Sequence, residues 1–189
     1  MAFQLEGAAL LLIDVQQGFD DPRWGQRNNP AAEGNIARLL DRWRRSGWPV
    51  LHAQHHSRLP QSLLAPGQPG NDIKPEVLPL PEEPVFGKSV NSAFIGTGLE
   101  AHLQVTGIDR LVLVGLTTDH CVSTTARMGA NLGYQVVVVA DATATFDRSG
   151  PDGRQFSADE MHATALASLH GEFAVIVKTN DVLSRLAAR

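Results

Sequence analysis

The chain has 189 residues, 43% of them hydrophobic and 19% charged, a composition typical of one globular domain spanning 1–189. The formal net charge of −4 argues against a nucleic-acid-binding surface, and no apolar run has the length of a membrane span. The first residues lack the basic segment and the small-residue cleavage site of a signal peptide. The single cysteine cannot form an internal disulfide, so a reducing cytoplasmic location is expected.

Several short runs are nearly continuously apolar, as expected of strands that are covered on both faces. The five clearest runs are 8–15, 49–54, 110–115, 134–140 and 173–178. A weaker sixth candidate is 83–88, which has the sequence EPVFGK.

The first amphipathic stretch, 29–47, predicts a helix between the first two strands. Asn29 can cap its start, Pro30 suits the first helical position and Gly47 suits the end. Its apolar stripe consists of Ile36, Leu39, Leu40 and Trp43.

Two later helices begin with capping-box spacing. Thr97 precedes Glu100 by three residues, and Ser157 precedes Glu160 by the same distance. The resulting alternation of strands and helices predicts an α/β fold in three layers. We expect a mostly parallel six-stranded, Rossmann-like sheet with helices on both faces. The Pro/Gly-rich segment 60–84 is long for a loop and is expected to cap a site or a subunit contact.

Ligands of such sheets bind at the carboxyl ends of the strands, where this chain places Asp14, Lys88 and Cys121. Cys121 lies at the predicted start of a helix, where free N–H groups and the helix dipole lower a thiol pKa and favour the thiolate. The same N–H groups can stabilise an oxyanion. Each residue alone has an ordinary explanation: a buried small side chain, a loop-bonding aspartate and a surface lysine. Together they place a nucleophile, an acid/base group and a cation on one edge.

Three segments carry a resemblance to a known family. LLLIDVQQGF, FGKSVNSAF and VGLTTDHCVSTTAR, in this order, resemble the isochorismatase-like cysteine hydrolases, a superfamily that includes nicotinamidases and N-carbamoylsarcosine amidohydrolases. The resemblance covers nearly the whole chain and implies a catalytic triad of Asp14, Lys88 and Cys121. It also implies an oxyanion hole from the N–H groups of Thr117 and Cys121, after a cis peptide at Leu116–Thr117.

By this resemblance the chain hydrolyses a C–N bond, in an amide or ureido group of a small molecule, through a thioester. Asp14 takes the proton of Cys121 and passes it to the leaving amine. Enzymes of the family that cleave the vinyl ether of isochorismate commonly lack this cysteine. Because Cys121 is present, C–N hydrolysis is favoured, and vinyl-ether hydrolysis is the alternative. A homo-oligomer, dimer or tetramer, is also implied.

A cluster of three histidines, His52, His55 and His56, invites a metal-site hypothesis. Strand alternation predicts that His52 and His56 share one face and that His55 lies on the other. The nicotinamidases have an Asp-x-His pair at this place, whereas Gln54 stands here where the aspartate would fall. We therefore expect no metal and no cofactor, with Gln54 and His56 lining the substrate pocket.

Two aromatic residues after the first strand are further candidates for the pocket. Phe19 matches an aromatic pocket position of the family, and Trp24 lies on the same loop; a core role for Phe19 is equally open.

Other functions receive less support from the sequence. A nucleotide-binding protein would need a Gly-rich turn after the first strand, which DVQQGFDD does not provide. A non-enzymatic binding protein would be expected to lack a member of the triad, and a redox sensor would be expected to carry a resolving cysteine.

Overall fold

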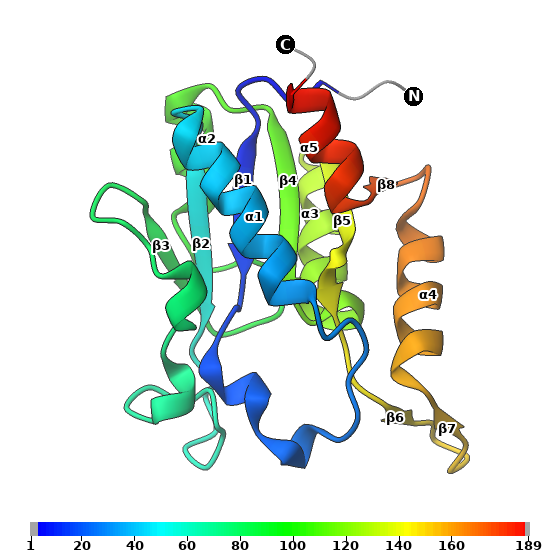
Figure 1. Ribbon diagram of the computed structural model, residues 1–189. Helices are drawn as coiled ribbons and strands as arrows, with labels where there is room; N and C mark the ends of the chain where they lie inside the picture. The colour runs from blue at the N-terminus through cyan, green and yellow to red at the C-terminus, as the bar shows by residue number, and fades with distance from the viewer. Residues whose placement is uncertain (1–3, 188–189) are drawn as a thin grey trace.

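The computed structural model describes residues 4–187 and contains a six-stranded parallel sheet (Figure 1). The strand order is β3-β2-β1-β4-β5-β8, and each neighbouring pair is parallel. The expected α/β sheet is therefore confirmed, with all six strands running in the same direction. The strands are β1 (Ala9–Ile13), β2 (Val50–His55), β3 (Val85–Lys88), β4 (Arg110–Leu116), β5 (Gln135–Ala144) and β8 (Val175–Val177).

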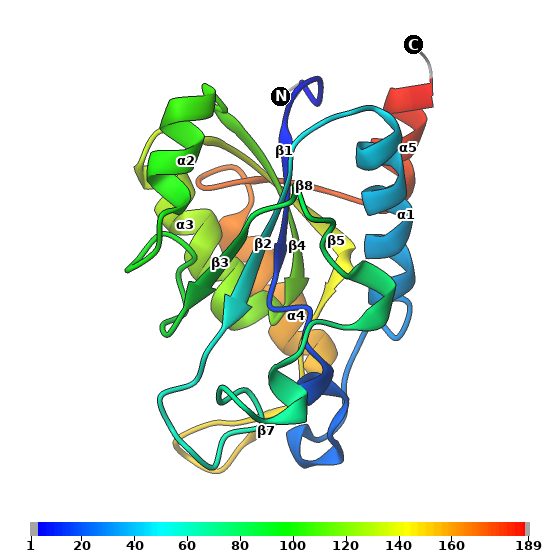
Figure 2. The same cartoon turned by 90° about the vertical axis from the view of Figure 1, so that its left-hand side faces the viewer.

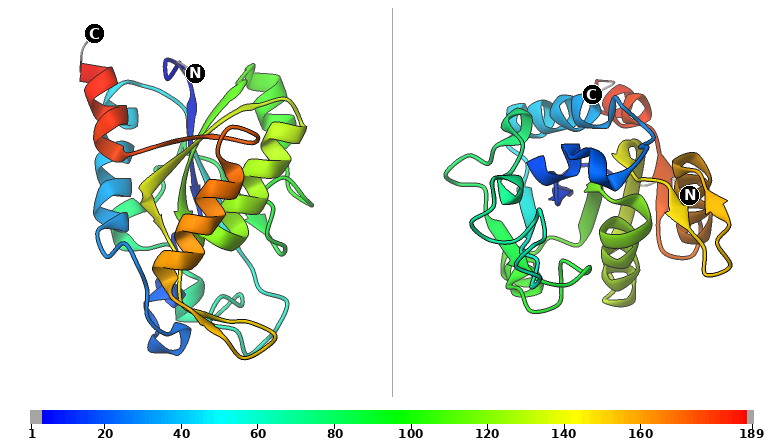
Figure 3. Two further views of the ribbon diagram at one scale, coloured as in Figure 1. Left: turned by 90° about the vertical axis from the view of Figure 1, so that its right-hand side faces the viewer. Right: turned by 90° about the horizontal axis from the view of Figure 1, so that it is seen from below.

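Helices cover both faces of the sheet, as Figure 2 and the left view of Figure 3 show. Alternate residues of β1 supply the two cores: Leu10 and Leu12 pack on one face, Leu11 and Ile13 on the other. On the first face lie α1 (Ala32–Arg45) and α5 (Thr179–Ala187); on the second lie α2 (Leu99–Thr106), α3 (Ser123–Asn131) and α4 (Ala158–Leu169). No helix within residues 4–187 is long and apolar enough to cross a membrane.

The predicted apolar stripe of α1 is buried in full, but the start of the helix differs from the prediction. Asn29 has a positive φ of 44° and is not the N-cap, a position taken by Ala31. The Asn29 amide instead donates hydrogen bonds to the carbonyls of Ala140 and Thr143 on β5. The side chain therefore ties the loop before α1 to the sheet.

The two predicted capping boxes have different outcomes. Ser157 and Glu160 form a complete capping box at the start of α4. Thr97 forms none, since α2 begins after Gly98. The Thr97 hydroxyl donates to the carbonyl of Ala93 and accepts from the Leu99 N–H, so it still contacts the start of the helix.

The carboxyl edge of the sheet is covered by irregular segments, at the bottom of Figure 1. The segment between β2 and β3 packs against the loop after β1: Gln16 and Ile73 form an isolated bridge, and Lys74 N–H donates to the Val15 carbonyl. These contacts place part of the long segment over the carboxyl edge of the sheet. The remaining short elements are η1 (Gln17–Asp20), η2 (Pro22–Trp24), η3 (Pro69–Asn71), η4 (Pro75–Val77), β6 (Arg148–Ser149) and β7 (Gln155–Phe156).

Candidate active site

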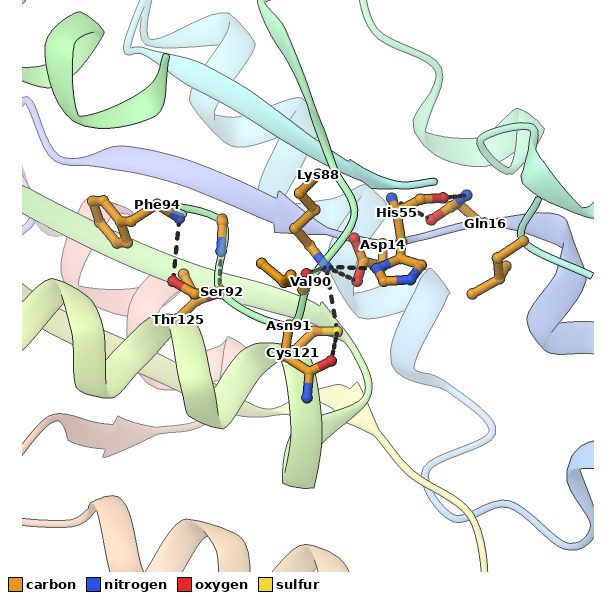
Figure 4. Close-up of polar contacts among 12 residues, drawn as sticks. Asp14, Gln16, His55, Lys88, Val90, Asn91, Ser92, Phe94, Cys121 and Thr125 are labelled. Atoms are coloured by element: carbon orange, nitrogen blue, oxygen red, sulfur yellow. Dashed lines mark hydrogen bonds and ion pairs between the residues drawn. The ribbon is translucent and has the colours of Figure 1, made fainter. Parts of the chain in front are cut away.

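The side chains of Asp14, Lys88 and Cys121 meet at the carboxyl edge of the sheet (Figure 4). The Lys88 Nζ atom lies 2.6 Å from Oδ2 of Asp14 and 3.3 Å from Sγ of Cys121. The Asp14 and Lys88 side chains are fully buried, while Cys121 retains 8% of its exposure. The thiol is therefore the member of the cluster that faces an incoming molecule.

Close packing of β1 against β4 fixes the position of Asp14. Ile13 pairs with Gly115 in the parallel register, and Asp14 follows with φ of 50°, in the left-handed region that residues with a Cβ rarely adopt. Gly115 has φ of 118°, and a Cβ there would clash with the carbonyl of Ile13. Glycine at 115 lets β4 approach β1 closely enough to bring the nucleophile turn beside Asp14.

Lys88 is the last residue of β3, and the segment after it is tied to α3. The Ala93 N–H donates to Thr125 Oγ1 on α3 over 3.1 Å, and the Phe94 N–H donates to Ser92 Oγ. Lys88 Nζ also donates to the carbonyl of Val90 over 3.1 Å. The strand end and the helix that follows Cys121 are therefore held together by hydrogen bonds.

Cys121 lies in a π-helical turn, η5 (Thr118–Val122), which precedes α3. The Thr117 carbonyl accepts hydrogen bonds from the N–H groups of His120 and Val122 and so closes this turn. The sequence pattern predicts an α-helix that starts at Cys121, whereas α3 begins two residues later. The Leu116–Thr117 peptide bond is cis, as the resemblance implied.

Burial controls the charge state of the site. It raises the pKa of Asp14 above the ordinary 3.8, with the Lys88 ammonium acting in the opposite direction. Burial also raises the pKa of the Cys121 thiol, and the negative charge of Asp14 adds to this rise. The expectation of a thiol pKa lowered by a helix terminus is wrong, because desolvation and the nearby carboxylate outweigh Lys88.

His55 also belongs to this cluster and was not among the predicted catalytic residues. The register of β2 and β3 places His55 directly opposite Lys88, and the His55 Nδ1 atom lies 3.2 Å from Lys88 Nζ. Burial, followed by the charge of Lys88, lowers the pKa of His55 to about 4. Alternation along the strand predicts that His55 and His56 lie on opposite faces. It does not predict the contact of His55 with Lys88, which depends on the pairing of β2 with β3.

The other two histidines of the cluster have separate partners. His52 is buried, and its Nε2 atom lies 3.1 Å from Oε2 of Glu83. His56 Nδ1 lies 3.2 Å from Oδ1 of Asn71. The Gln54 amide donates to the Asn71 carbonyl over 2.8 Å. Gln54 and His56 thus both contact Asn71, a buried residue that the sequence analysis did not single out.

The cluster of Asp14, His55 and Cys121 does not fit a metal ion. Within the described part of the chain, Asp14, His55 and Cys121 have ligand atoms within 4.8 Å of one another. However, the Lys88 ammonium lies between these three side chains, 2.6 to 3.3 Å from an atom of each. A cation bound by the same atoms would meet this positive charge at contact distance. The lysine therefore occupies the place that a metal would need.

The predicted aromatic residues form a cluster with Phe146. The ring centroids of Phe19 and Trp24 lie 5.1 Å apart, and Phe146 stacks against both. Phe19 is buried and packs with Leu116 and Ala144, at the carboxyl ends of β4 and β5. The aromatic cluster therefore adjoins the end of β4, which leads to Cys121. Phe146 was not predicted as part of this cluster because it lies far from Phe19 and Trp24 in the sequence.

Two polar residues near the thiol differ in orientation. Asn91 is exposed, and its Oδ1 atom lies 3.9 Å from Cys121 Sγ (Figure 4). The His120 side chain is 56% exposed, and its Nε2 atom lies 3.6 Å from a carboxylate oxygen of Asp119. The His120 side chain therefore interacts with Asp119.

Comparison with known proteins places this chain in a family. The Isochorismatase domain matches residues 8–181. The chain belongs to the isochorismatase family. It is 46% identical over 179 residues to the uncharacterized isochorismatase family protein YrdC of Bacillus subtilis, covering 95% of this chain and 96% of YrdC. The crystal structure of an isochorismatase-family protein from Chromobacterium violaceum has 47% sequence identity and a TM-score of 0.95, covering 100% and 98% of the two chains.

Relatives in the isochorismatase family include proteins named for amide hydrolysis. Nicotinamidase 3 of Arabidopsis thaliana is 29% identical over 184 residues, covering 90% of this chain and 84% of that protein. N-carbamoylsarcosine amidase of Thermoplasma acidophilum has 25% identity and a TM-score of 0.71, covering 92% and 96%. The secreted effector Isc1 of Verticillium dahliae is 31% identical over 177 residues, covering 94% and 90%, so membership of the family does not by itself assign a compartment.

Proposed function

We propose that this isochorismatase-family hydrolase cleaves the C–N bond of a small amide or ureido compound through a thioester on Cys121. The observation that carries the proposal is the contact of one Lys88 ammonium with both the Asp14 carboxylate and the Cys121 sulfur, at 2.6 and 3.3 Å. A nucleophile, a base and a fixed cation are the groups that acyl transfer requires.

In the first half-reaction, Sγ of Cys121 attacks the carbonyl carbon as its proton moves to Asp14. The raised pKa of Asp14 suits a group that accepts this proton and then gives it to the departing nitrogen. Breakage of the C–N bond releases ammonia or an amine and leaves the acyl group on sulfur. Lys88 remains protonated and stabilises the negative charge that develops on Sγ.

In the second half-reaction, water attacks the thioester carbon. Asp14 takes a proton from the water, and the C–S bond breaks to release a carboxylic or carbamic acid. The proton held by Asp14 returns to sulfur and restores the thiol. We propose that the N–H groups of Thr117 and Cys121 stabilise the oxyanion in both steps, since Cys121 lies in the turn that presents Sγ and Thr117 is its N-cap.

For the substrate pocket we propose Phe19, Trp24, Gln54 and His56, which all lie at the carboxyl edge. The aromatic cluster offers an apolar wall, and Gln54 and His56 offer polar groups held by Asn71. The proposed reaction uses no metal and no cofactor. A homo-oligomer and a cytoplasmic location also remain predictions, and light scattering after size-exclusion chromatography measures the former.

The decisive experiment is a screen of small amides, ureido acids and lactams for released ammonia or amine. Wild type and Cys121→Ala are compared on each compound, with intact-protein mass spectrometry after acid quenching. Because the chain has one cysteine, an acyl adduct that is absent from the alanine variant identifies the thioester. Equal turnover by the two proteins, or turnover of a vinyl ether alone, would contradict the proposal.

A further inference from the structure

We propose that His55 is a positioning residue for Lys88: its Nδ1 atom accepts a hydrogen bond from the ammonium and holds it between Asp14 and Cys121. The inference rests on the proposed function, since it assigns His55 a part in the same reaction. It extends the three-residue site to a fourth side chain on a different strand.

The Lys88 ammonium has more acceptors around it than it has protons. Four acceptor atoms lie within 3.3 Å of Nζ, and a lysine ammonium carries three N–H bonds. The shortest contact, to Asp14, is the strongest attraction and would draw the ammonium away from the thiol. His55 and the Val90 carbonyl hold Nζ from other directions. The position of Nζ relative to Sγ therefore depends on these two weaker acceptors.

The chemistry of the contact assigns the state of His55. An ammonium can only donate, so Nδ1 must carry a lone pair, and the proton of the neutral imidazole lies on Nε2. The lowered pKa of about 4 agrees with a neutral ring at ordinary pH. Four charged or titratable groups surround the ring: Lys88 and His56, whose charges lower its pKa, and Asp14 and Cys121, whose side-chain atoms lie within 4.8 Å of it. The Val90 carbonyl forms a hydrogen bond with the ring.

The backbone of His55 is anchored by the segment that carries Asp14. The Gln16 side chain accepts from the His55 N–H over 2.9 Å and donates to the His55 carbonyl over 3.0 Å. Gln16 is fully buried, and Asn71 donates to the same carbonyl over 2.8 Å. Because Gln16 follows Asp14 by two residues, these hydrogen bonds fix the position of His55 relative to Asp14.

The test uses two replacements of similar shape that differ in one property. His55→Asn retains an acceptor near the position of Nδ1, and His55→Leu does not. We expect His55→Leu to lower kcat by about 10- to 100-fold with little change in KM, as for a lost hydrogen bond to a charged group. His55→Asn should keep most of the activity. Equal losses of kcat in the two variants would show that the imidazole ring itself is required, rather than an acceptor atom, and would overturn the inference.

A second measurement does not depend on any substrate. The rate of alkylation of the single cysteine by iodoacetamide is followed against pH in both variants, with His170→Asn, exposed at the end of α4, as a control. His55→Leu should move the midpoint upward by about one pH unit, since an ammonium that shifts away from sulfur stabilises the thiolate less. His55→Asn and His170→Asn should match wild type.

The two measurements separate the inference from the proposed function. If no amide is hydrolysed but the alkylation midpoints differ as expected, the C–N hydrolase assignment fails and the role of His55 stands. If His55→Leu alkylates like wild type, the positioning role is wrong even where hydrolysis is found. Thermal unfolding of each variant checks the fold, and His55→Ala replaces His55→Leu in the comparison if the leucine variant does not fold.

Discussion

Nζ of Lys88 and Oδ2 of Asp14 form an ion pair of 2.6 Å in which both side chains are completely buried. Burying two charges costs free energy that the mutual attraction often fails to recover, so such a pair is weak evidence for a stabilising role. The other carboxylate oxygen, Oδ1, is buried and has no hydrogen-bond partner within residues 4–187. A buried acceptor without a partner costs free energy, so it needs an explanation other than stability. An exchange of a proton with an incoming group, as proposed for Asp14, supplies one.

Replacement of Cys121 by alanine should lower hydrolysis by at least about a thousandfold, because the nucleophile is lost while the rest of the site remains. The free energy of unfolding should change little, since the side chain is small. Initial rates on a substrate found in the screen, together with urea unfolding curves, provide the test. An alanine variant that retains full activity would eliminate Cys121 as the nucleophile.

Replacement of Lys88 by methionine should destabilise the protein by about 3–5 kcal/mol, because it leaves the Asp14 carboxylate buried without its counter-ion. Adding Asp14→Asn to this variant should recover part of the stability without recovering activity. Chemical unfolding of the single and double variants at pH 7 measures both effects. A double variant less stable than Lys88→Met would show that the pair acts mainly by stabilising the fold.

The activity should fall at acidic pH through protonation of Asp14. Its pKa is raised from 3.8, so the carboxylate that accepts the thiol proton is lost at a higher pH than for an exposed aspartate. Below that point kcat/KM should decrease about tenfold per pH unit. The apparent value belongs to the coupled Asp14–Cys121 system. A profile from pH 4 to 9 without an acidic limb, in protein shown to remain folded, would contradict the role of Asp14.

Hydrolysis should not depend on a metal ion, because Lys88 lies where a metal bound by Asp14, His55 and Cys121 would sit. We expect activity to survive prolonged dialysis against a chelator, with wild-type kinetics afterwards. Elemental analysis of the purified protein should find no stoichiometric zinc or iron. Loss of activity that added zinc restores would contradict this expectation.

The stability of the fold should depend on the ionised form of Glu33. This carboxylate accepts from Arg27 over 2.6 and 2.8 Å and from Lys74 over 2.7 Å, and its pKa is lowered from 4.5 to about 2. A lowered folded-state pKa gives stability that is complete above pH 4.5 and is lost as the pH falls toward 2. The contribution is on the order of 2 kcal/mol.

Glu33→Gln should accordingly be less stable at pH 7 and should lose less stability than wild type between pH 5 and pH 3. Urea unfolding at the three pH values measures this difference. Identical slopes of stability against pH in the two proteins would assign the acid sensitivity to other groups.

The general position of the site could be predicted from the sequence. Buried parallel strands are nearly continuous apolar runs, and their carboxyl ends share one edge, so Asp14, Lys88 and Cys121 could be assigned to that edge from the residues that follow each run. The apolar stripe of α1 and the capping box of α4 are equally local signals. Both depend on residues within a few positions of one another, and the structure contains both.

What the tertiary structure decided was how these residues act on one another. The thiol pKa is raised by desolvation and by the charge of Asp14, which outweigh the Lys88 ammonium, and no helix-start pattern encodes these contacts. Likewise, alternation along β2 predicts the face of His55, but its contact with Lys88 depends on the pairing of β2 with β3. Sequence patterns report which face or edge a side chain occupies, whereas charge states and hydrogen-bond partners arise from segments far apart in the chain.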